Sequence, residues 1–163
     1  MQLKPTTKTT VLLLLVASLL VAGCTTQNTT NNSGTATGGY MSVKIANATV
    51  PTQITLITIP KTGYKFVAYN ATVTNENATD RQVHANMFAL HDSNKNVYNT
   101  DYLIQTNKSF NAFPYVYKMT EPGDKVNGII VFEVPQNAKL TSLTYDDHSV
   151  AYNNYRGNVT IKL

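Results

Sequence analysis

The stretch KVNGIIVFEV (residues 125–134) decides the fold class, because its side chains alternate in chemical character with a period of two. One face would carry a nearly continuous apolar row, Val126, Gly128, Ile130, Phe132 and Val134. The other face would carry Asn127, Ile129, Val131 and Glu133. Successive side chains of a β-strand point to opposite sides of a sheet, so this pattern predicts a strand with one buried face.

The same period recurs through the chain after residue 40, and no segment there has the period of a convincing helix. In YKFVAYNATVTN (residues 64–75) one face carries Val67, Tyr69, Ala71 and Val73. NVTIKL (residues 158–163) alternates in the same way. Further strands are predicted over residues 42–46, 53–59, 82–91, 113–119 and 140–145, with turn-forming residues between them. We therefore expect an all-β fold, an antiparallel immunoglobulin-like β-sandwich of about seven to nine strands.

The first 23 residues have the layout of a signal peptide. Lys4 and Lys8 precede an unbroken apolar run over residues 11–23. As a helix this run would span roughly 20 Å, against about 30 Å of bilayer hydrocarbon. It ends Val21-Ala22-Gly23-Cys24, which resembles the lipobox of prokaryotic lipoproteins. The resemblance implies that Cys24, the single cysteine, is alkylated by a diacylglycerol and becomes the new N-terminus; the alternative is an ordinary structural cysteine.

Residues 24–39 carry no charge, aromatic ring or large aliphatic side chain, so we expect a flexible linker behind the lipidated Cys24. Residues 40–163 have the length of one domain. Without the signal peptide the chain holds 11 basic and 9 acidic residues, a net charge of +2, and its lysines are scattered. This distribution does not indicate nucleic-acid binding. The predicted location is the cell membrane, lipid-anchored and facing the extracytoplasmic side.

Three segments of the domain carry a distinctive pattern of residues. The first is a hydrophobic strand that ends in Asn75, and the second is a turn with Phe88, Leu90, Asp92 and Tyr98. The third carries Pro122, Gly123, Asp124, Gly128, Phe132, Val134 and Pro135. Together these residues resemble a known family, the lipoprotein-associated domain of unknown function 4352. The likeness covers roughly residues 42–147 and implies an immunoglobulin-like sandwich on an exported lipoprotein, but no established activity. Asn94 stands where the family usually has glycine, and we expect it to adopt the left-handed conformation.

Candidate catalytic and metal-binding residues are few. His84 and His91 are seven residues apart, so an unbulged strand would point them to opposite faces. His148 beside Asp146 and Asp147 could assist a metal-dependent hydrolase, although a solvated turn explains the same residues. Residues 92–96 begin like a calcium loop but lack its glycine and its glutamate, so a hairpin turn is predicted there. We expect no cofactor and no bound metal.

Seven N-x-S/T sequons occur, where chance would give about three or four. In the predicted domain the acceptors are Asn47, Asn70, Asn77, Asn107 and Asn158. Asn70 and Asn158 lie on the predicted solvent-exposed faces of their strands, and Asn77 and Asn107 lie in predicted loops. Two interpretations remain open, N-glycosylation and a low-charge surface that happens to favour Asn and Thr.

A cluster of aromatic residues in the stretch YLIQTNKSFNAFPYVYKM (residues 102–119) is the candidate binding surface. Its members are Tyr102, Phe113, Tyr115 and Tyr117, and the last three would share one strand face. They could instead belong to the core. The sequence thus predicts a non-catalytic binding or envelope-assembly module whose partner is an envelope protein or a surface glycan. The alternatives are the small metal-dependent hydrolase at residues 146–148 and a purely structural spacer.

Overall fold

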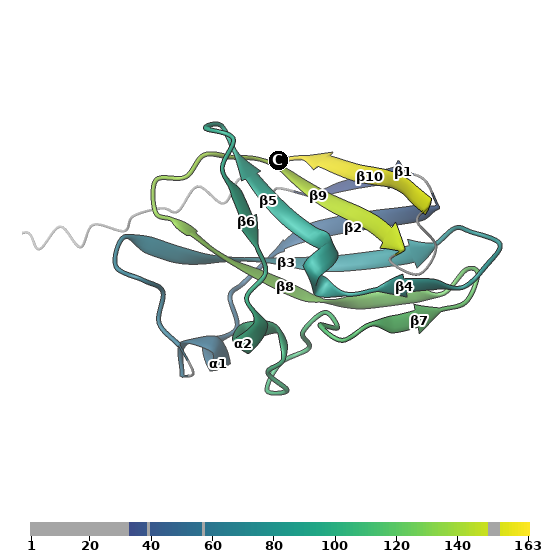
Figure 1. The fold of residues 1–163 in the computed structure, drawn as a ribbon. Coiled ribbons are helices and arrows are strands. Elements are labelled where there is room, and N and C mark those ends of the chain that lie inside the picture. The colour runs from purple at the N-terminus through teal and green to yellow at the C-terminus, as the bar shows by residue number, and fades with distance from the viewer. Residues whose placement is uncertain (1–32, 39, 57, 150–153) are drawn as a thin grey trace, which may run out of the picture.

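The structure, a computed structural model, describes residues 33–38, 40–56, 58–149 and 154–163. Within these ranges ten β-strands, two four-residue α-helices and one 3-10 turn follow one another (Figure 1). In chain order they are β1 (Gly34–Gly38), β2 (Met41–Ala48), α1 (Thr52–Thr55), β3 (Tyr64–Asn75), β4 (Arg81–Val83), η1 (Ala85–Met87), β5 (Phe88–Asp92), β6 (Val97–Asn99), α2 (Tyr102–Gln105), β7 (Lys118–Thr120), β8 (Lys125–Pro135), β9 (Leu140–Ser149) and β10 (Asn154–Lys162). No helix in these ranges has the length and apolar character needed to cross a bilayer.

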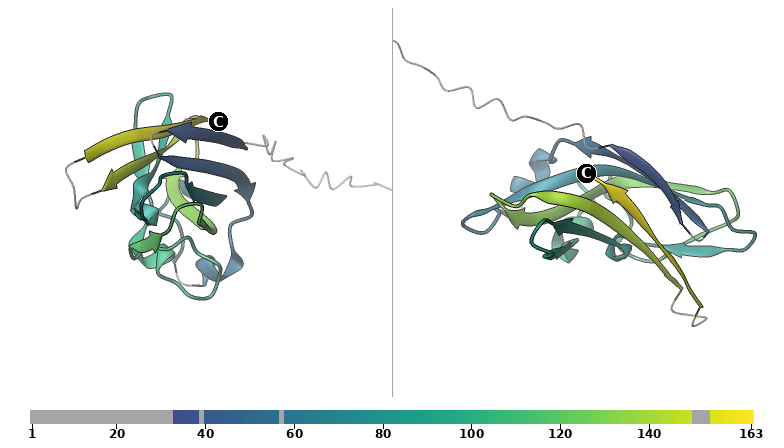
Figure 2. Two further views of the ribbon diagram at one scale, coloured as in Figure 1. Left: turned by 90° about the vertical axis from the view of Figure 1, so that its right-hand side faces the viewer. Right: turned by 90° about the horizontal axis from the view of Figure 1, so that it is seen from above.

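Two four-stranded sheets form the sandwich, with strand orders β1-β2-β3-β8 and β10-β9-β5-β6. A small third sheet pairs β4 with β7. The named strands pair antiparallel throughout. The views in Figure 2 show the two large sheets as separate layers that come together where β1 lies beside β10. The predicted antiparallel β-sandwich is therefore confirmed.

The core lies between the two large sheets and uses the faces that the sequence pattern predicts. Antiparallel register sets Tyr69 opposite Ile130, and Val73 opposite Val126. The second sheet contributes Phe88, Leu90, Leu143, Tyr145, Val159 and Ile161. Phe88 packs edge-on against Phe113 at 5.2 Å and against Tyr145 at 4.8 Å between ring centroids. Each of these large side chains removes apolar surface from water, which drives the two sheets together.

A second, smaller core covers the outer face of the first sheet. It consists of Ile54 from α1, Ala68 from β3, Ile104 from α2 and Val131 from β8. The two short helices each bury one isoleucine against this face. This explains why both faces of β8 are apolar, with Ile129 and Val131 on the side that a plain solvent-exposed strand would fill with polar residues.

Two predicted boundaries near the N-terminus are wrong. Residues 34–38 form β1 instead of continuing the linker, so the sandwich begins at Gly34 and not at residue 40. All five residues of β1 pair with β2. Gly34 also lets β1 approach β10 closely, because a Cβ there would collide with Ile161 of that strand. Residues 53–59 were expected as a strand, but residues 52–55 form α1, which buries Ile54 against the sheet.

The predicted strand over 82–91 is divided, and the one over 113–119 is mostly absent. The turn η1 separates β4 from β5, so His84 and His91 do not belong to one continuous strand. Of the residues 113–119 only Lys118 and Met119 lie in a strand, β7. The short strand β6 was not predicted, and β9 extends to Ser149, past the expected end at residue 145.

Candidate recognition surface

The structure separates the four predicted aromatic residues into core and surface. Phe113 is fully buried, Tyr115 is half-buried, and Tyr102 and Tyr117 are 58% and 52% exposed. The expected common face of Phe113, Tyr115 and Tyr117 is wrong, because this segment is not a strand. The Phe113 amide donates to the Ile129 carbonyl at 2.9 Å, and the Pro114 carbonyl accepts from the Ala85 amide at 2.7 Å. These two bonds turn Phe113 inward.

Gln105 fixes the segment beneath these rings, and no sequence signal marked it. Its side chain is buried, and Nε2 donates to the carbonyls of Phe113 and Ile129, each at 3.2 Å. Its Oε1 accepts from the Val131 amide at 3.0 Å. One amide side chain therefore joins α2, the 113–117 segment and β8. Asp101 caps the same helix by accepting from the Ile104 amide at 3.1 Å.

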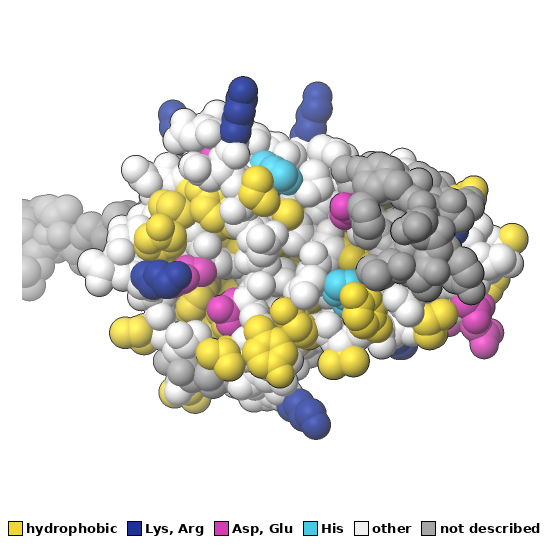
Figure 3. Space-filling model, viewed as in Figure 1, with side chains coloured by type: hydrophobic (Ala, Val, Ile, Leu, Met, Phe, Trp, Pro, Cys, Tyr) yellow, Lys and Arg dark blue, Asp and Glu magenta, His cyan; other side chains and the backbone are white. Residues whose placement is uncertain are grey.

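Two ring pairs form on this support. Tyr102 and Tyr115 meet edge-to-face with centroids 5.0 Å apart, and His84 packs on Tyr117 at 4.2 Å. Val116 and Met119 beside them are 75% and 55% exposed. We call these six residues, His84, Tyr102, Tyr115, Val116, Tyr117 and Met119, the recognition surface. In Figure 3 hydrophobic side chains gather along the lower part of the face shown, over α2 and β7.

The recognition surface consists of apolar side chains and rings, with polar groups at the tyrosine hydroxyls and on the His84 ring. Partial burial lowers the pKa of His84 below its usual 6.5, so its ring is neutral at pH 7. Tyrosine combines a large apolar ring with a hydroxyl that can bond to a partner, the composition typical of protein interfaces. Within the described ranges, no three His, Cys, Asp or Glu side chains come together as a metal-binding group.

The residues of the alternative hydrolase site lie in a strand and not in a turn. Asp146 and His148 belong to β9, where they pair with Asn158 and Tyr155 of β10. The predicted solvated loop at 146–148 is therefore wrong, because the hairpin continues further than the sequence pattern indicated. The side chains of Asp147 and His148 lie outside the described part. His91 on β5 contacts the Thr144 hydroxyl at 2.9 Å through Nε2.

Residues 92–96 form the predicted hairpin turn. Asp92 Oδ1 accepts from the amides of Asn94 and Asn96, both at 2.9 Å. Its Oδ2 accepts from Asn96 Nδ2 at 2.9 Å and from the Tyr98 hydroxyl at 2.7 Å. These bonds, led by the Asn96 side chain, lower the pKa of Asp92 from 3.8 to about 2. The left-handed residue is Lys95, with φ 67°, and not Asn94 as expected.

Asn75 organises the opposite end of the sandwich. It is fully buried, and its Nδ2 donates to the carbonyls of Thr120 at 2.9 Å and Thr79 at 3.0 Å. Its Oδ1 accepts from the Asn77 amide. Its backbone carbonyl accepts from the amide of Gly123, which adopts φ 84° in the turn before β8. The asparagine at the end of β3 and the Pro-Gly-acid turn are thus one structural unit.

The sequon asparagines occupy three kinds of position. Asn47 in β2 and Asn70 in β3 are exposed. Asn77 and Asn107 are half-buried in turns, where Asn77 Nδ2 donates to the Thr79 hydroxyl and Asn107 Oδ1 accepts from the Ser109 amide at 2.7 Å. Asn158 lies in β10, but its side chain is outside the described part. Cys24 also lies outside the described residues.

Comparison with known proteins gives a family and a fold. A family model described as a domain of unknown function (DUF4352) matches residues 31–156. The structure is similar to a "putative lipoprotein (ycdA)" from Bacillus subtilis, with a TM-score of 0.55 and 15% identity, over 82% of this chain and 38% of that one. The yjhA protein from Bacillus subtilis has a TM-score of 0.55 at 16% identity, over 80% and 96% of the two chains. No curated protein matches the sequence.

A functionally unknown protein from Listeria monocytogenes EGD-e has a TM-score of 0.51 at 12% identity, with 82% of each chain covered. At these identities the likenesses show the fold alone. The chain spans little more than a third of the ycdA protein, so the rest of that molecule has no counterpart in the comparison.

Proposed function

The chain belongs to the family of the domain of unknown function DUF4352, and from that premise we propose that it is an exported, lipid-anchored β-sandwich that binds an envelope partner without catalysis. The partner is an envelope protein or a surface glycan. The recognition surface is the observation that carries this proposal.

Exposed aromatic residues held by a rigid support favour binding over a purely structural role. Tyr102 and Tyr117 keep more than half of their surface in water, although the core beside them buries other large rings completely. Gln105 and the buried Phe113 hold the backbone beneath them, so little conformational freedom remains to be lost when a partner binds. The three hydrogen bonds from the Gln105 side chain to backbone groups hold the exposed tyrosines in place, and this arrangement fits a binding site better than a spacer.

Export and anchoring rest on the sequence. The apolar run over residues 11–23 and the Val21–Cys24 motif have the pattern of a lipoprotein leader. The structurally similar ycdA protein is described as a "putative lipoprotein". This likeness supports an envelope location but does not test the role of Cys24. Two acyl chains suffice for stable anchoring.

Photo-crosslinking on intact cells tests the binding role. A photoreactive amino acid replaces Val116, which is 75% exposed in the recognition surface, or Val97, which is 54% exposed in β6. We expect a discrete adduct from position 116 and none from position 97. Mass spectrometry then tells whether the adduct is a protein or a glycan.

A second variant tests whether the tyrosines make the contact. Tyr102→Ser removes one ring of the Tyr102–Tyr115 pair. Because Tyr102 is exposed, the substitution should leave the fold intact. It should weaken the adduct from position 116 several-fold. Equal labelling at positions 116 and 97, or no adduct at either, would leave the structural spacer as the remaining function.

A further inference from the structure

Exposed aliphatic side chains also gather at the two short helices, next to the Tyr102 edge of the recognition surface. Leu56 directly follows α1 and is 86% exposed, and Ile59 in the same connection is 78% exposed. Leu103 on α2 is 65% exposed. Ile54 and Ile104 bury themselves in the same small core, so both helices lie on one region of the sheet. We call Leu56, Ile59 and Leu103 the apolar end.

Strand register places the apolar end at the same end of the sandwich as the N-terminal chain. Gly34 opens β1 opposite Ile45, close to the end of β2 at Ala48. Ala48 pairs with Ala68 near the start of β3, and Tyr64 pairs with Pro135 at the end of β8. The connection that contains α1, Leu56 and Ile59 runs from β2 to β3 at this end. Figure 1 shows α1 and α2 together there.

The chain between the predicted anchor and the sandwich is short. Because β1 begins at Gly34, ten peptide steps separate it from Cys24. Even fully extended, ten steps reach only about 35 Å. A lipid on Cys24 therefore holds this end of the sandwich close to the bilayer surface, whatever conformation the intervening residues adopt.

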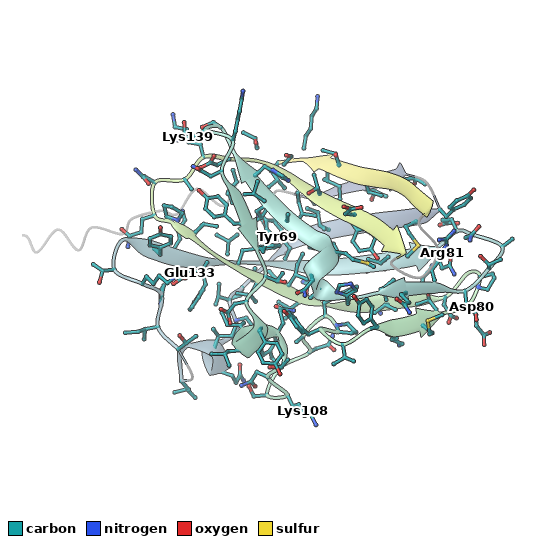
Figure 4. All side chains as sticks on the ribbon, viewed as in Figure 1. Tyr69, Asp80, Arg81, Lys108, Glu133 and Lys139 are labelled. Carbon is teal, nitrogen blue, oxygen red and sulfur yellow. The ribbon has the colours of Figure 1, made fainter. Side chains whose placement is uncertain are left out.

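Charge differs between the two ends. The exposed residues Lys61, Lys65 and Lys108 flank the apolar end, where Glu133 is paired with Lys61 at 3.2 Å and Asp101 caps α2. At the opposite end, the described loops before β4 and β8, together with the first residue of each of these strands, hold Glu76, Asp80, Glu121 and Asp124 beside Arg81 and Lys125. Figure 4 shows Lys108 near α2 and Asp80 at the far end. Anionic lipid headgroups attract the first end and repel the second.

We propose that the apolar end docks onto the surface of the lipid bilayer, an inference that rests on the lipid anchor of the proposed function. Leu56, Ile59 and Leu103 enter the boundary between headgroups and acyl chains, and the three lysines contact anionic headgroups. The acidic end then points away from the membrane. In this orientation Tyr102 lies at the membrane surface beside Leu103, and the part of the recognition surface formed by His84 and Tyr117 lies further from the bilayer and stays accessible.

Single tryptophans test this orientation directly, because the chain contains none. Leu56→Trp and Leu103→Trp report on the apolar end at two independent, exposed sites. Ala78→Trp is the control, since Ala78 is exposed in the loop after β3 at the acidic end. The mature lipidated protein is reconstituted into vesicles of phosphatidylglycerol and dibrominated phosphatidylcholine, and tryptophan fluorescence is measured before and after flotation.

Bromine quenches only tryptophans that reach the acyl chains. We expect fluorescence at positions 56 and 103 to fall at least about twofold, with little change at position 78. Equal quenching at all three positions in floated protein would overturn the docking while leaving the anchor intact. Protein that does not float with the vesicles would instead overturn the anchor on which both proposals rest.

Discussion

Single polar side chains hold the turns of this sandwich, and they are the residues that the family pattern contains. Asn75 joins the loop after β3 to the turn before β8 through its side chain and its backbone. Asp92 accepts four hydrogen bonds and closes the β5–β6 hairpin onto Tyr98. The matching family positions are therefore explained by folding, and a binding site must be sought elsewhere on the surface.

Replacing Asn75 with alanine tests the first of these roles. Asn75→Ala leaves the buried Thr120 carbonyl, the Thr79 carbonyl and the Asn77 amide without their side-chain partner, so the free energy of unfolding should fall by about 2 kcal/mol or more. Urea denaturation measures it. Asn70→Ala on the same strand is the control, because Asn70 is exposed, and its effect should stay within about 0.5 kcal/mol. Equal losses in the two variants would refute the role of Asn75.

Acid titration tests Asp92. Its pKa is about 2 in the folded protein against an ordinary 3.8, so its carboxylate stabilises the fold above about pH 4. This stabilisation is lost as the pH falls from about 4 toward 2. The urea midpoint of the wild type should therefore drop over this range relative to that of Asp92→Asn. Parallel curves for the two proteins would show that Asp92 carries no such linkage.

The elements divide into those that the residue pattern predicts and those that tertiary contacts create. Strands β3, β8 and the end of β10 were predictable because one face of each is continuously apolar. β1 was not, since its small, polar residues pair through the backbone and carry no periodic signal. α1 was mistaken for a strand because its β-branched residues favour strands, whereas in the structure it packs on the sheet through the buried Ile54.

The crossing of residues 112–113 over β8 is such a tertiary contact, and Gly128 makes it possible. A Cβ on residue 128 would meet the backbone of Phe113. Gly128→Ala should therefore destabilise the protein by about 1–3 kcal/mol through overpacking, as measured by thermal and urea unfolding. The neighbouring Asn127→Ala is exposed and should have little effect. A stable Gly128→Ala protein would mean that the crossing can move away at no cost.

At the scale of the whole molecule, the two ends and one side of the sandwich have different chemistry. The sequence grouped tyrosines 102, 115 and 117 as a candidate binding surface; in the structure Tyr102 contacts Tyr115 and Tyr117 is exposed, and their binding role stays a prediction. The predicted cluster wrongly included Phe113, since alternation along an assumed strand cannot reveal a chain that turns inward through two backbone bonds. The apolar end escaped prediction because its residues come from segments about 45 positions apart in the sequence.

The most direct test of the account is the state of residue 24 in the exported protein. Mass spectrometry of the membrane fraction should find a chain that begins at Cys24 and carries a diacylglycerol on its sulfur. Cys24→Ser should move the protein from the membrane to the aqueous fraction. A membrane-bound protein that retains residues 1–23, or a serine variant that still sediments with membranes after export, would contradict the proposed anchoring.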